Sequence, residues 1–463
     1  MLARWHGPGG YKDVLRVGLP LIFSMISHTV MQFTDRVFLG NYSMDAIAAS
    51  LPAGVAYFLF FSFFMGIAEY VSVFVAQYTG AKLDDRVGAA LWQGIYFALV
   101  ASLLISCLYF FSEEIFAFAG HPAKVQQLEV TYFNYLLAGS SFAITSVVLS
   151  SFYSGRGMTW PVAAVNFIGA ALNIPLDYAL INGKWGLPEM GIAGAGLATA
   201  IGSAFIVLLF VMILFTRKND ERFCVRSAWR FEGYLFKKFL SYGLPGGVHF
   251  FLDIFGFTLF VFIVGRIGRI ELATTNIVFS IELLAFLPLM GLSIAASVLA
   301  GQAIGADNPA QAKRSVMSAA QISLFCMLVA SLGFIFLPEP MISLFRTNGL
   351  PAEEFEKIVE MGSALLKLVA IYSVINAPVL ALTGGLKGAG DIRFVMTMIT
   401  ICSLTFLVLP TYIMVEYMGT GIFGPWINVI IYVSVLLLIS SLRFTSDRWT
   451  RHRIVDEPPP VVK

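Results

Sequence analysis

The sequence predicts an all-α integral membrane protein whose twelve transmembrane helices form two six-helix bundles related by a pseudo-twofold axis. The first reason is composition: of 463 residues, 58% are hydrophobic and only 13% are charged, whereas soluble domains carry about 25% charged residues. The second is that the apolar residues come in blocks long enough to cross a bilayer. The third is that patterns of the first half recur in the second.

A helix needs about 20 mostly apolar residues to span the hydrocarbon core, and twelve segments of the chain meet this requirement. The loops between them are short. In chain order, the segments cover residues 14–38, 52–78, 88–111, 128–154, 161–182, 191–215, 236–264, 275–301, 314–337, 357–386, 394–415 and 420–442.

One polar loop separates the first six segments from the last six. This loop, 216–235, is the longest and is rich in arginine and lysine. We therefore predict an N-lobe over residues 1–215, a cytoplasmic linker over 216–235 and a C-lobe over 236–442. The tail 443–463 ends in "DEPPPVVK" and is expected to be cytoplasmic and disordered.

The halves share short motifs in one register. "GLP" at 18–20 recurs at 243–245, and "MG" at 65–66 recurs at 290–291, both at a shift of 225 residues. Later, Arg156-Gly157 matches Lys387-Gly388 at a shift of 231 residues. With six helices per half, both halves start on the same side, so the repeat is parallel with its axis along the membrane normal. Duplicated halves around a central site are typical of alternating-access transporters.

The distribution of basic residues predicts the orientation. If the N-terminus is cytoplasmic, the cytoplasmic segments hold about three times as many Lys and Arg as the external ones. We therefore expect a multi-pass protein of the plasma (inner) membrane with both termini in the cytoplasm. The first ten residues lack the apolar centre of a cleavable signal, so we expect the first helix to direct insertion.

Several classes of protein are disfavoured. The net charge of +2 comes without a basic stripe, so we expect no nucleic-acid partner. The four cysteines do not form a framework and are expected to be free thiols. The five histidines are scattered, and no metal-ligand cluster or nucleophile–base set is visible, so we predict no enzyme, no structural metal and no cofactor. No G-x-x-x-x-G-K-[ST] loop is present, so ATP is not the expected energy source.

Ionisable side chains inside the apolar blocks are the first candidates for function, because they are costly in a membrane. The candidates are His28, Asp35, Glu69, Asp177, His249, Asp253, Glu282 and Lys367.

The fifth segment carries the most specific pattern, "NFIGAALNIPLDY", from Asn166 to Tyr178. Asn173 and Asp177 are i,i+4 neighbours and share one helix face. Pro175 between them removes a backbone hydrogen bond, which membrane helices tolerate where the freed groups line a cavity or find new partners. The pattern predicts a polar pocket that faces inward.

The second half offers a comparable set. Asp253 follows Pro245 on the seventh segment and lies among phenylalanines. Tyr372 and Asn376 are i,i+4 neighbours on the tenth segment. The second half therefore also has an acid on its first helix and a polar face on another.

Taken together, these features resemble the multidrug and toxic compound extrusion (MATE) family over essentially the whole chain. The motifs are "QFTDRVFLG" on the first helix, "NIPLDY" on the fifth, "GIAGAGLATA" at the start of the sixth and "GLP" at the start of the seventh. Their order and spacing carry the resemblance more than any single motif.

The resemblance implies a cation-binding network in the N-lobe, made by Asp35, Asn173, Asp177 and Thr199, with a proton or Na⁺ held at Asp35 and Asp177. Sodium-coupled, NorM-like members also use an acid on helix 7 and an aspartate on helix 10, with a tyrosine one turn earlier.

Asp253 and Tyr372 match this second pattern, but Asn376 stands at the helix 10 aspartate position. The departure favours the N-lobe for coupling. Glu282 on the eighth helix is the alternative acid of a second cation or substrate site.

The function implied is that of a secondary active antiporter that exports lipophilic, often cationic drugs or toxic compounds in exchange for an inward H⁺ or Na⁺. We expect it to be monomeric, with membrane lipids as its other partners. The alternative is a lipid-linked or polysaccharide flippase of the same superfamily. Such a flippase should line its cavity with Arg or Lys, whereas the intramembrane charges here are chiefly acidic.

Overall fold

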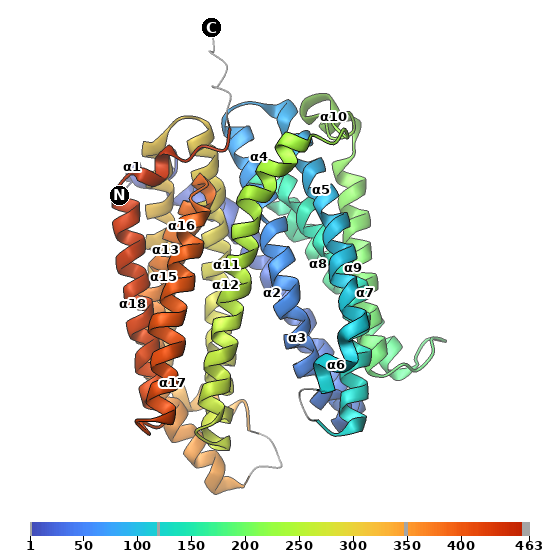
Figure 1. The fold of residues 1–463 in the computed structure, drawn as a ribbon, viewed down its shortest axis with the longest axis vertical. Helices are drawn as coiled ribbons and strands as arrows, with labels where there is room; N and C mark the ends of the chain where they lie inside the picture. The colour runs from blue at the N-terminus through green and yellow to red at the C-terminus, as the bar shows by residue number, and fades with distance from the viewer. Residues whose placement is uncertain (1, 118–120, 347–350, 456–463) are drawn as a thin grey trace. The chain divides into compact units, whose positions relative to one another are not determined.

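The computed structural model describes residues 2–117, 121–346 and 351–455, and these residues are predominantly helical (Figure 1). The helices of the first half are α1 Leu2–His6, α2 Tyr11–Tyr42, α3 Met44–Ala68, α4 Tyr70–Gly80, α5 Asp84–Ser106, η1 Cys107–Phe111, α6 Ser112–Ala117, α7 Ala123–Gly155, α8 Trp160–Asn182, α9 Ile192–Leu214 and α10 Arg217–Phe223. Those of the second half are α11 Gly233–Gly265, α12 Arg269–Gly305, α13 Pro309–Phe336, α14 Pro338–Ser343, α15 Ala352–Ala389, α16 Ile392–Cys402, η2 Ser403–Val408, α17 Leu409–Glu416, α18 Phe423–Thr445 and η3 Arg448–Arg451.

The described residues contain twelve helical stretches that are long and apolar enough to cross a membrane, which confirms the predicted number and the all-α fold class. Several helices extend beyond the apolar segments. For example, α12 covers Arg269–Gly305, whereas the apolar segment covers 275–301. Hydropathy marks only the part suited to the hydrocarbon core, while the backbone hydrogen-bond ladder continues into polar residues at both ends.

The helices of the two halves repeat the same packing. In the first half α7, the fourth span, packs against α3, α5 and α9. In the second half α15, the tenth span and therefore the fourth of its half, packs against α12, α13 and α18. This common pattern supports the predicted duplication, and the direction of the axis between the halves stays a prediction.

Two close helix contacts show how the repeats correspond. The backbone carbonyl of Ser72 lies against Gly155, and that of Ser297 lies against Gly388, so neither glycine leaves room for a Cβ. Ser72 and Ser297 are 225 residues apart, as the repeat predicts. The structure therefore makes Gly155 the counterpart of Gly388, and the predicted pairing of Gly157 with Gly388 is wrong. A local sequence match does not reveal which glycine touches the neighbouring helix.

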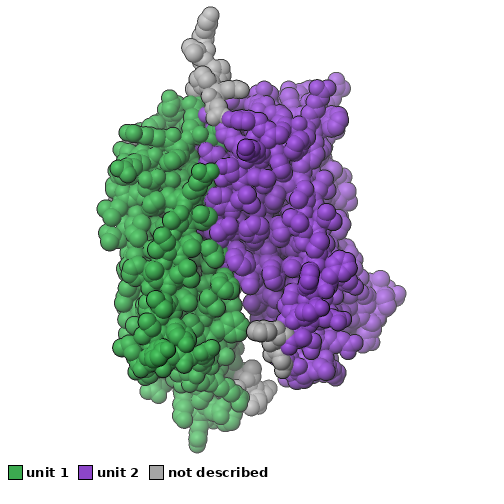
Figure 2. Space-filling view, in the orientation of Figure 1, with its two compact units in different colours: residues 1–22, 252–454 green, residues 23–251, 455–463 purple. Residues whose placement is uncertain are grey.

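The described chain forms two compact units whose boundaries differ from the predicted lobes (Figure 2). Of the described residues, unit 1 contains 2–22 and 252–454, and unit 2 contains 23–251 and residue 455. The chain thus passes from one unit to the other inside α2 and again inside α11, and not at the linker 216–235. Loops mark where helices end, but packing decides which unit a helix segment joins.

The beginning of α2 packs with the second half of the chain. Val14, Val17 and Leu21 are buried in one apolar core of unit 1. Leu292 and Ala295 of α12 belong to the same core. The first three turns of α2 are therefore part of the hydrophobic interior of unit 1.

The beginning of α11 packs with the first half in the equivalent way. Gly246 approaches the backbone of Gly66 in α3 so closely that a side chain would not fit. The ring of Tyr242 stacks on that of Tyr70 in α4, with ring centroids 6.2 Å apart. Each half of the sequence thus gives the start of its first helix to the other unit.

The linker 216–235 is a structured segment that includes α10. Asp220 accepts hydrogen bonds from the backbone N–H groups of Arg226 and Ser227, at 2.7 and 3.1 Å. Arg222 pairs with Asp84 of α5 at 2.8 Å. These contacts fix the linker against unit 2.

The expectation of a disordered tail is wrong for residues 443–455, while residues 456–463 lie outside the described residues. Arg443 forms an ion pair with the buried Asp391 at 2.7 Å. Trp449 is fully buried, and its indole N–H donates to the carbonyl of Phe444 at 2.8 Å. The prediction of disorder was based on the proline-rich end of the tail, and it does not apply to the residues that precede this end.

Candidate functional site

The candidate site lies in unit 2, where α2 and α8 run side by side in the same direction. The amide of Asn166 donates to the hydroxyl of Ser24 at 2.6 Å. About three turns further along both helices, the carboxyl groups of Asp35 and Asp177 approach each other. The first and fifth spans cross a membrane in the same direction. The two contacts are therefore separated by the same number of residues on α2 and on α8.

The pair of Asp35 and Asp177 is buried, and three of its four carboxyl oxygens lack a donor among the described residues. Asp35 is 5% exposed and Asp177 is 0% exposed. Among the described residues, no hydrogen-bond donor reaches Oδ1 of Asp35 or either carboxyl oxygen of Asp177. Two ionised carboxylates at this range would repel each other strongly at low dielectric. The geometry therefore suits a proton or a cation shared between them.

Asn173 adds an amide to the same face, one turn before Asp177 on α8. Its side chain is fully buried, and neither Oδ1 nor Nδ2 has a hydrogen-bond partner among the described residues. Gly202 on α9 packs against it and leaves space for the amide. Asn173 thus offers one more uncommitted oxygen beside the acids, as the spacing predicted.

Thr199, the fourth predicted member, lies on α9. Its hydroxyl donates to the carbonyl of Ala195 at 3.0 Å. A serine or threonine inside a helix often bonds to its own backbone in this way. A role of Thr199 in holding a cation stays a prediction.

Tyr132 of α7 belongs to the site and was missed by sequence reasoning. It is buried, and its hydroxyl interacts electrostatically with Asp35 and Asp177. Tyr57 of α3 lies next to Tyr132. A single tyrosine in an apolar block has no distinctive spacing, so only the packing of α7 on its neighbours reveals it.

Glu129 is a second buried residue that the list of intramembrane acids missed. It is fully buried on α7, one turn before Tyr132, and its Oε1 lies 2.6 Å from Nδ1 of His121. Glu129 is the second residue of the predicted segment 128–154, and an acid at the end of a span is expected to reach the polar headgroups.

The structure brings together only part of the predicted C-lobe set, which lies in unit 1. Glu282 of α12 is buried and lies within hydrogen-bonding reach of Tyr372 of α15. Asp253 of α11 is exposed and has other neighbours, Lys387 and Tyr432.

Asn376 follows Tyr372 by one turn and is half-buried. The C-lobe candidates therefore form a Glu282–Tyr372 pair and a separate Asp253. Their role in cation or substrate binding stays a prediction.

The N-lobe cluster offers oxygen ligands only. Within the described ranges, no group of three or more His, Cys, Asp and Glu side chains is arranged to hold a metal ion. Two carboxylates and one amide oxygen suit a proton or a hard monovalent cation better than a transition metal.

Twelve spans in two repeated halves, with uncommitted acids in the helical interior, are the architecture of a secondary transporter. The MatE family model matches residues 20–179 and 245–413, which together make up more than half of the chain. The chain therefore belongs to the MatE family of transporters, and the resemblance seen in the sequence motifs is confirmed. Members of this family are transporters rather than enzymes.

Several bacterial relatives match nearly the whole chain. It is 27% identical over 441 residues to the "Probable multidrug resistance protein NorM" of Bradyrhizobium diazoefficiens, covering 95% of this chain and 94% of that protein. It is 29% identical over 389 residues to the "Probable multidrug resistance protein NorM" of Pseudomonas aeruginosa, covering 82% of this chain and 78% of that protein. It is 25% identical to the "Multidrug resistance protein MdtK" of Pectobacterium atrosepticum, covering 94% and 95%. The apolar helices and these relatives together indicate a multi-pass protein of the inner membrane.

Solved structures share the fold at low sequence identity. One is described as "Outward-facing conformation of a multidrug resistance MATE family transporter of the MOP superfamily", with a TM-score of 0.87, 18% identity, and coverage of 96% of this chain and 98% of that one. Another, from Pyrococcus furiosus, is described by the words "Reverse polarity of binding pocket suggests different function" and has a TM-score of 0.86 at 18% identity, with coverage of 96% and 97%.

Proposed function

We propose that this protein is a secondary active multidrug efflux antiporter that exports lipophilic, often cationic organic compounds in exchange for an inward H⁺ or Na⁺. The observation that carries the proposal is the buried cluster of Asp35, Asp177 and Asn173, in which Oδ1 of Asp35, both carboxyl oxygens of Asp177 and both amide atoms of Asn173 have no hydrogen-bond partner among the described residues. The names of the NorM and MdtK relatives support a drug as the cargo.

Alternating access would couple the cation to the drug through this cluster. A cation that arrives from outside neutralises the pair of Asp35 and Asp177 and favours the state that releases substrate outward. Release of the cation inside restores the charge, so that the protein accepts substrate again. A ligand drives such a cycle only through its different affinity for the two states. Here the difference would come from the cost of burying the unneutralised acids.

One cation per cycle supplies enough energy for export. One charge that moves inward through about 150 mV yields roughly 3.5 kcal/mol. This free energy supports a gradient of roughly 300-fold for a neutral substrate.

The substrate class follows from the side chains that a substrate would meet. The chain contains 42 Phe and 17 Met, and such residues form adaptable apolar walls. Acids within the spans attract cations. We propose that Asp253, Glu282, Tyr372 and Asn376 contribute to substrate binding or to a second cation site.

The orientation and assembly belong to the same proposal. Both termini are placed in the cytoplasm because the loops on that side carry more Lys and Arg. We propose a monomer that has membrane lipids as its other partners.

The alternative, a flippase for lipid-linked or polysaccharide substrates, shares the fold. A structure with this fold from Pyrococcus furiosus is described as suggesting a different function, and in general a fold alone does not decide the cargo. The acidic character of the buried cluster favours cationic cargo over anionic carriers.

The test is transport by purified protein in proteoliposomes with separately imposed proton and sodium gradients. We expect accumulation of a fluorescent lipophilic cation to follow one of the two gradients and to stop when an ionophore collapses it. If neither gradient drives transport of lipophilic cations, the antiporter proposal is wrong.

A further inference from the structure

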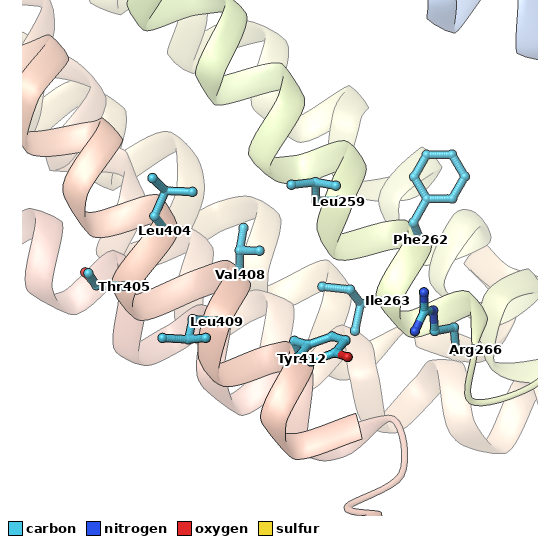
Figure 3. A pocket seen from close by; sticks show the side chains of 9 residues that line it. All are labelled: Leu259, Phe262, Ile263, Arg266, Leu404, Thr405, Val408, Leu409 and Tyr412. Carbon is cyan, nitrogen blue, oxygen red and sulfur yellow. The ribbon is translucent and has the colours of Figure 1, made fainter. Parts of the chain in front are cut away.

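A long apolar groove runs along unit 1 between α11 and the segment formed by η2 and α17 (Figure 3). Its volume is about 590 Å³. Leu259 and Ile263 of α11 face Val408 and Tyr412 across the groove (Figure 3). The segment of α11 from Leu259 to Gly265 is about 9 Å long. The groove therefore has the length and apolar lining to take part of an acyl chain.

Local geometry explains why the helices leave a groove here. Deeper in the span, Gly256 lies directly against the hydroxyl of Ser403, so α11 and η2 touch. From Ser403 to Val408 the chain forms a π-helical turn, and Pro410 follows in the first turn of α17. Turns of this kind widen a helix locally and are frequent at functional sites. The two helices therefore separate beyond their contact at Gly256.

An ion pair closes the other end of the groove. Arg266 directly follows the last residue of α11, and its Nη1 lies 2.6 Å from Oε1 of Glu416, the last residue of α17. The side chains are 61% and 33% exposed. Since both residues lie at the ends of membrane spans, the pair is at the level where lipid headgroups meet the protein.

A second hollow continues the groove beyond this ion pair. Its volume is about 340 Å³, and it is lined by Arg266, Glu416, Gly419 and Gly421, among others. Both glycines have positive φ angles and no neighbouring atoms within 4 Å of an added Cβ. The loop thus leaves open, polar space next to the charges, in contrast to the apolar groove.

We propose that this combined surface binds one phospholipid with a zwitterionic ethanolamine headgroup, with an acyl chain in the groove of Figure 3. The phosphate binds Arg266, and the primary ammonium binds Glu416. The site lies in unit 1, away from the cluster of Asp35, Asp177 and Asn173 in unit 2, and does not depend on the antiporter proposal.

The charges select this headgroup over others. An anionic lipid with a glycerol headgroup satisfies Arg266, but it offers Glu416 only neutral hydroxyl donors and brings it no positive charge. A choline headgroup carries no N–H group, so it donates no hydrogen bond to Glu416. A phosphate and an ammonium on one headgroup match both members of the pair, with the charge-assisted hydrogen bonds that such groups form.

The experiment is native mass spectrometry of the full-length, delipidated protein with dioleoyl phosphatidylethanolamine, phosphatidylglycerol or phosphatidylcholine at equal concentrations. We expect one tightly retained phosphatidylethanolamine, with apparent affinity at least several-fold above that for the other two lipids. Equal retention of phosphatidylglycerol or phosphatidylcholine would overturn the proposed headgroup.

Two variants test the two ends of the site. Removing both charges with Arg266→Gln and Glu416→Gln should reduce retention to the level seen for phosphatidylcholine. Val408→Phe should reduce it by filling the groove. The matched control is the double change Arg217→Gln and Glu221→Gln, which removes another exposed ion pair and should leave retention unchanged.

The outcomes separate the alternatives. The proposal would be overturned if phosphatidylethanolamine retention stayed unchanged in the charge variant or in Val408→Phe, while the thermal unfolding midpoint of that variant equalled the wild-type value. Displacement of the lipid by a lipophilic organic cation, with no selectivity among phospholipids, would also overturn it and make the groove a substrate path. If Val408→Phe does not fold, the charge variant alone decides the outcome.

Discussion

Asp35 and Asp177 are residues that a membrane helix carries only at a cost. A charged acid near the centre of a span costs about 2.5–3.5 kcal/mol on insertion scales, and here two acids share one buried place. Asn173 brings uncommitted amide atoms to the same place. The arrangement is explained if the pair takes up and releases a cation. A purely structural role at this place would not require two neighbouring acids.

Asp253 should contribute to the affinity for cationic substrates. Asp253 interacts with Lys387, whereas Glu282 pairs with Tyr372. We expect Asp253→Asn to weaken binding of cationic substrates by about fivefold, which corresponds to about 1 kcal/mol, and to leave neutral substrates unaffected. Transport assays with a matched pair of charged and neutral substrates check this. Equal losses for both would show a structural or coupling role.

Asp220 should hold the linker in place at neutral pH. The backbone N–H of Arg226, with the N–H and hydroxyl of Ser227, lowers the pKa of Asp220 below its ordinary value of 3.8. A lowered pKa in the folded state means that the carboxylate stabilises the linker above pH 3.8 and loses this effect as the pH falls through the folded value.

Asp220→Ala removes these hydrogen bonds at every pH. We expect faster amide hydrogen exchange at Arg226 and Ser227 at pH 7, measured by mass spectrometry. The control is Asp85→Ala, which removes an exposed acid in the first turn of α5. It should leave the exchange rates at Arg226 and Ser227 as in the wild type. Slow exchange in Asp220→Ala would show that other contacts hold the linker.

Helices in this protein approach closely where glycine allows it. Gly388 of α15 lies against the carbonyl of Ser297 in α12, and Gly155 of α7 lies against that of Ser72 in α4. In membranes, such small residues bring helices together in the absence of a strong hydrophobic effect between them.

Gly388→Ala should therefore destabilise the protein by about 1–3 kcal/mol, the usual cost of overpacking. Thermal unfolding in detergent measures the effect. The control is Gly54→Ala in α3, where nothing lies within 4 Å of the added Cβ, so stability should be unchanged or slightly higher. An unaltered unfolding midpoint for Gly388→Ala would mean that α12 and α15 separate without cost.

The sequence predicted the helices well because the length of an apolar run directly reflects the thickness of a bilayer. It also predicted the shared face of Asn173 and Asp177, which depends only on helical spacing. It did not reveal Tyr132, which joins the site through packing of α7. It also mispaired Gly157, since contacts between helices are not encoded in a local match.

At the level of the whole chain, each half contributes the start of its first helix to the opposite unit. Residues 2–22 belong to the unit formed by residues 252–454. There Val14, Val17 and Leu21 are buried with residues of α12. The sequence repeat alone gives no sign of this exchange, because it places the boundary at the polar loop.

The exchange predicts that neither half folds alone. We expect fragment 233–463 to aggregate when it is expressed by itself, because the core of unit 1 then lacks the first turns of α2. Co-expression with fragment 1–232 should give a complex that co-purifies and runs as a single species in size-exclusion chromatography. A monodisperse, thermally stable fragment 233–463 would contradict this view of the units.

The most direct test of the proposed coupling site is the behaviour of Asp35→Asn, with substrate binding and gradient-driven export measured on the same purified variant. Asn keeps the size of the side chain and mimics its neutral form, but it cannot release a proton. We expect this variant to fold, to reach the membrane and to bind substrate, while export falls to the level of protein-free vesicles. Asp85→Asn, the same change at an exposed position, should export normally. Full export by Asp35→Asn would contradict the proposal and place the coupling at other acids, with Asp253 and Glu282 next.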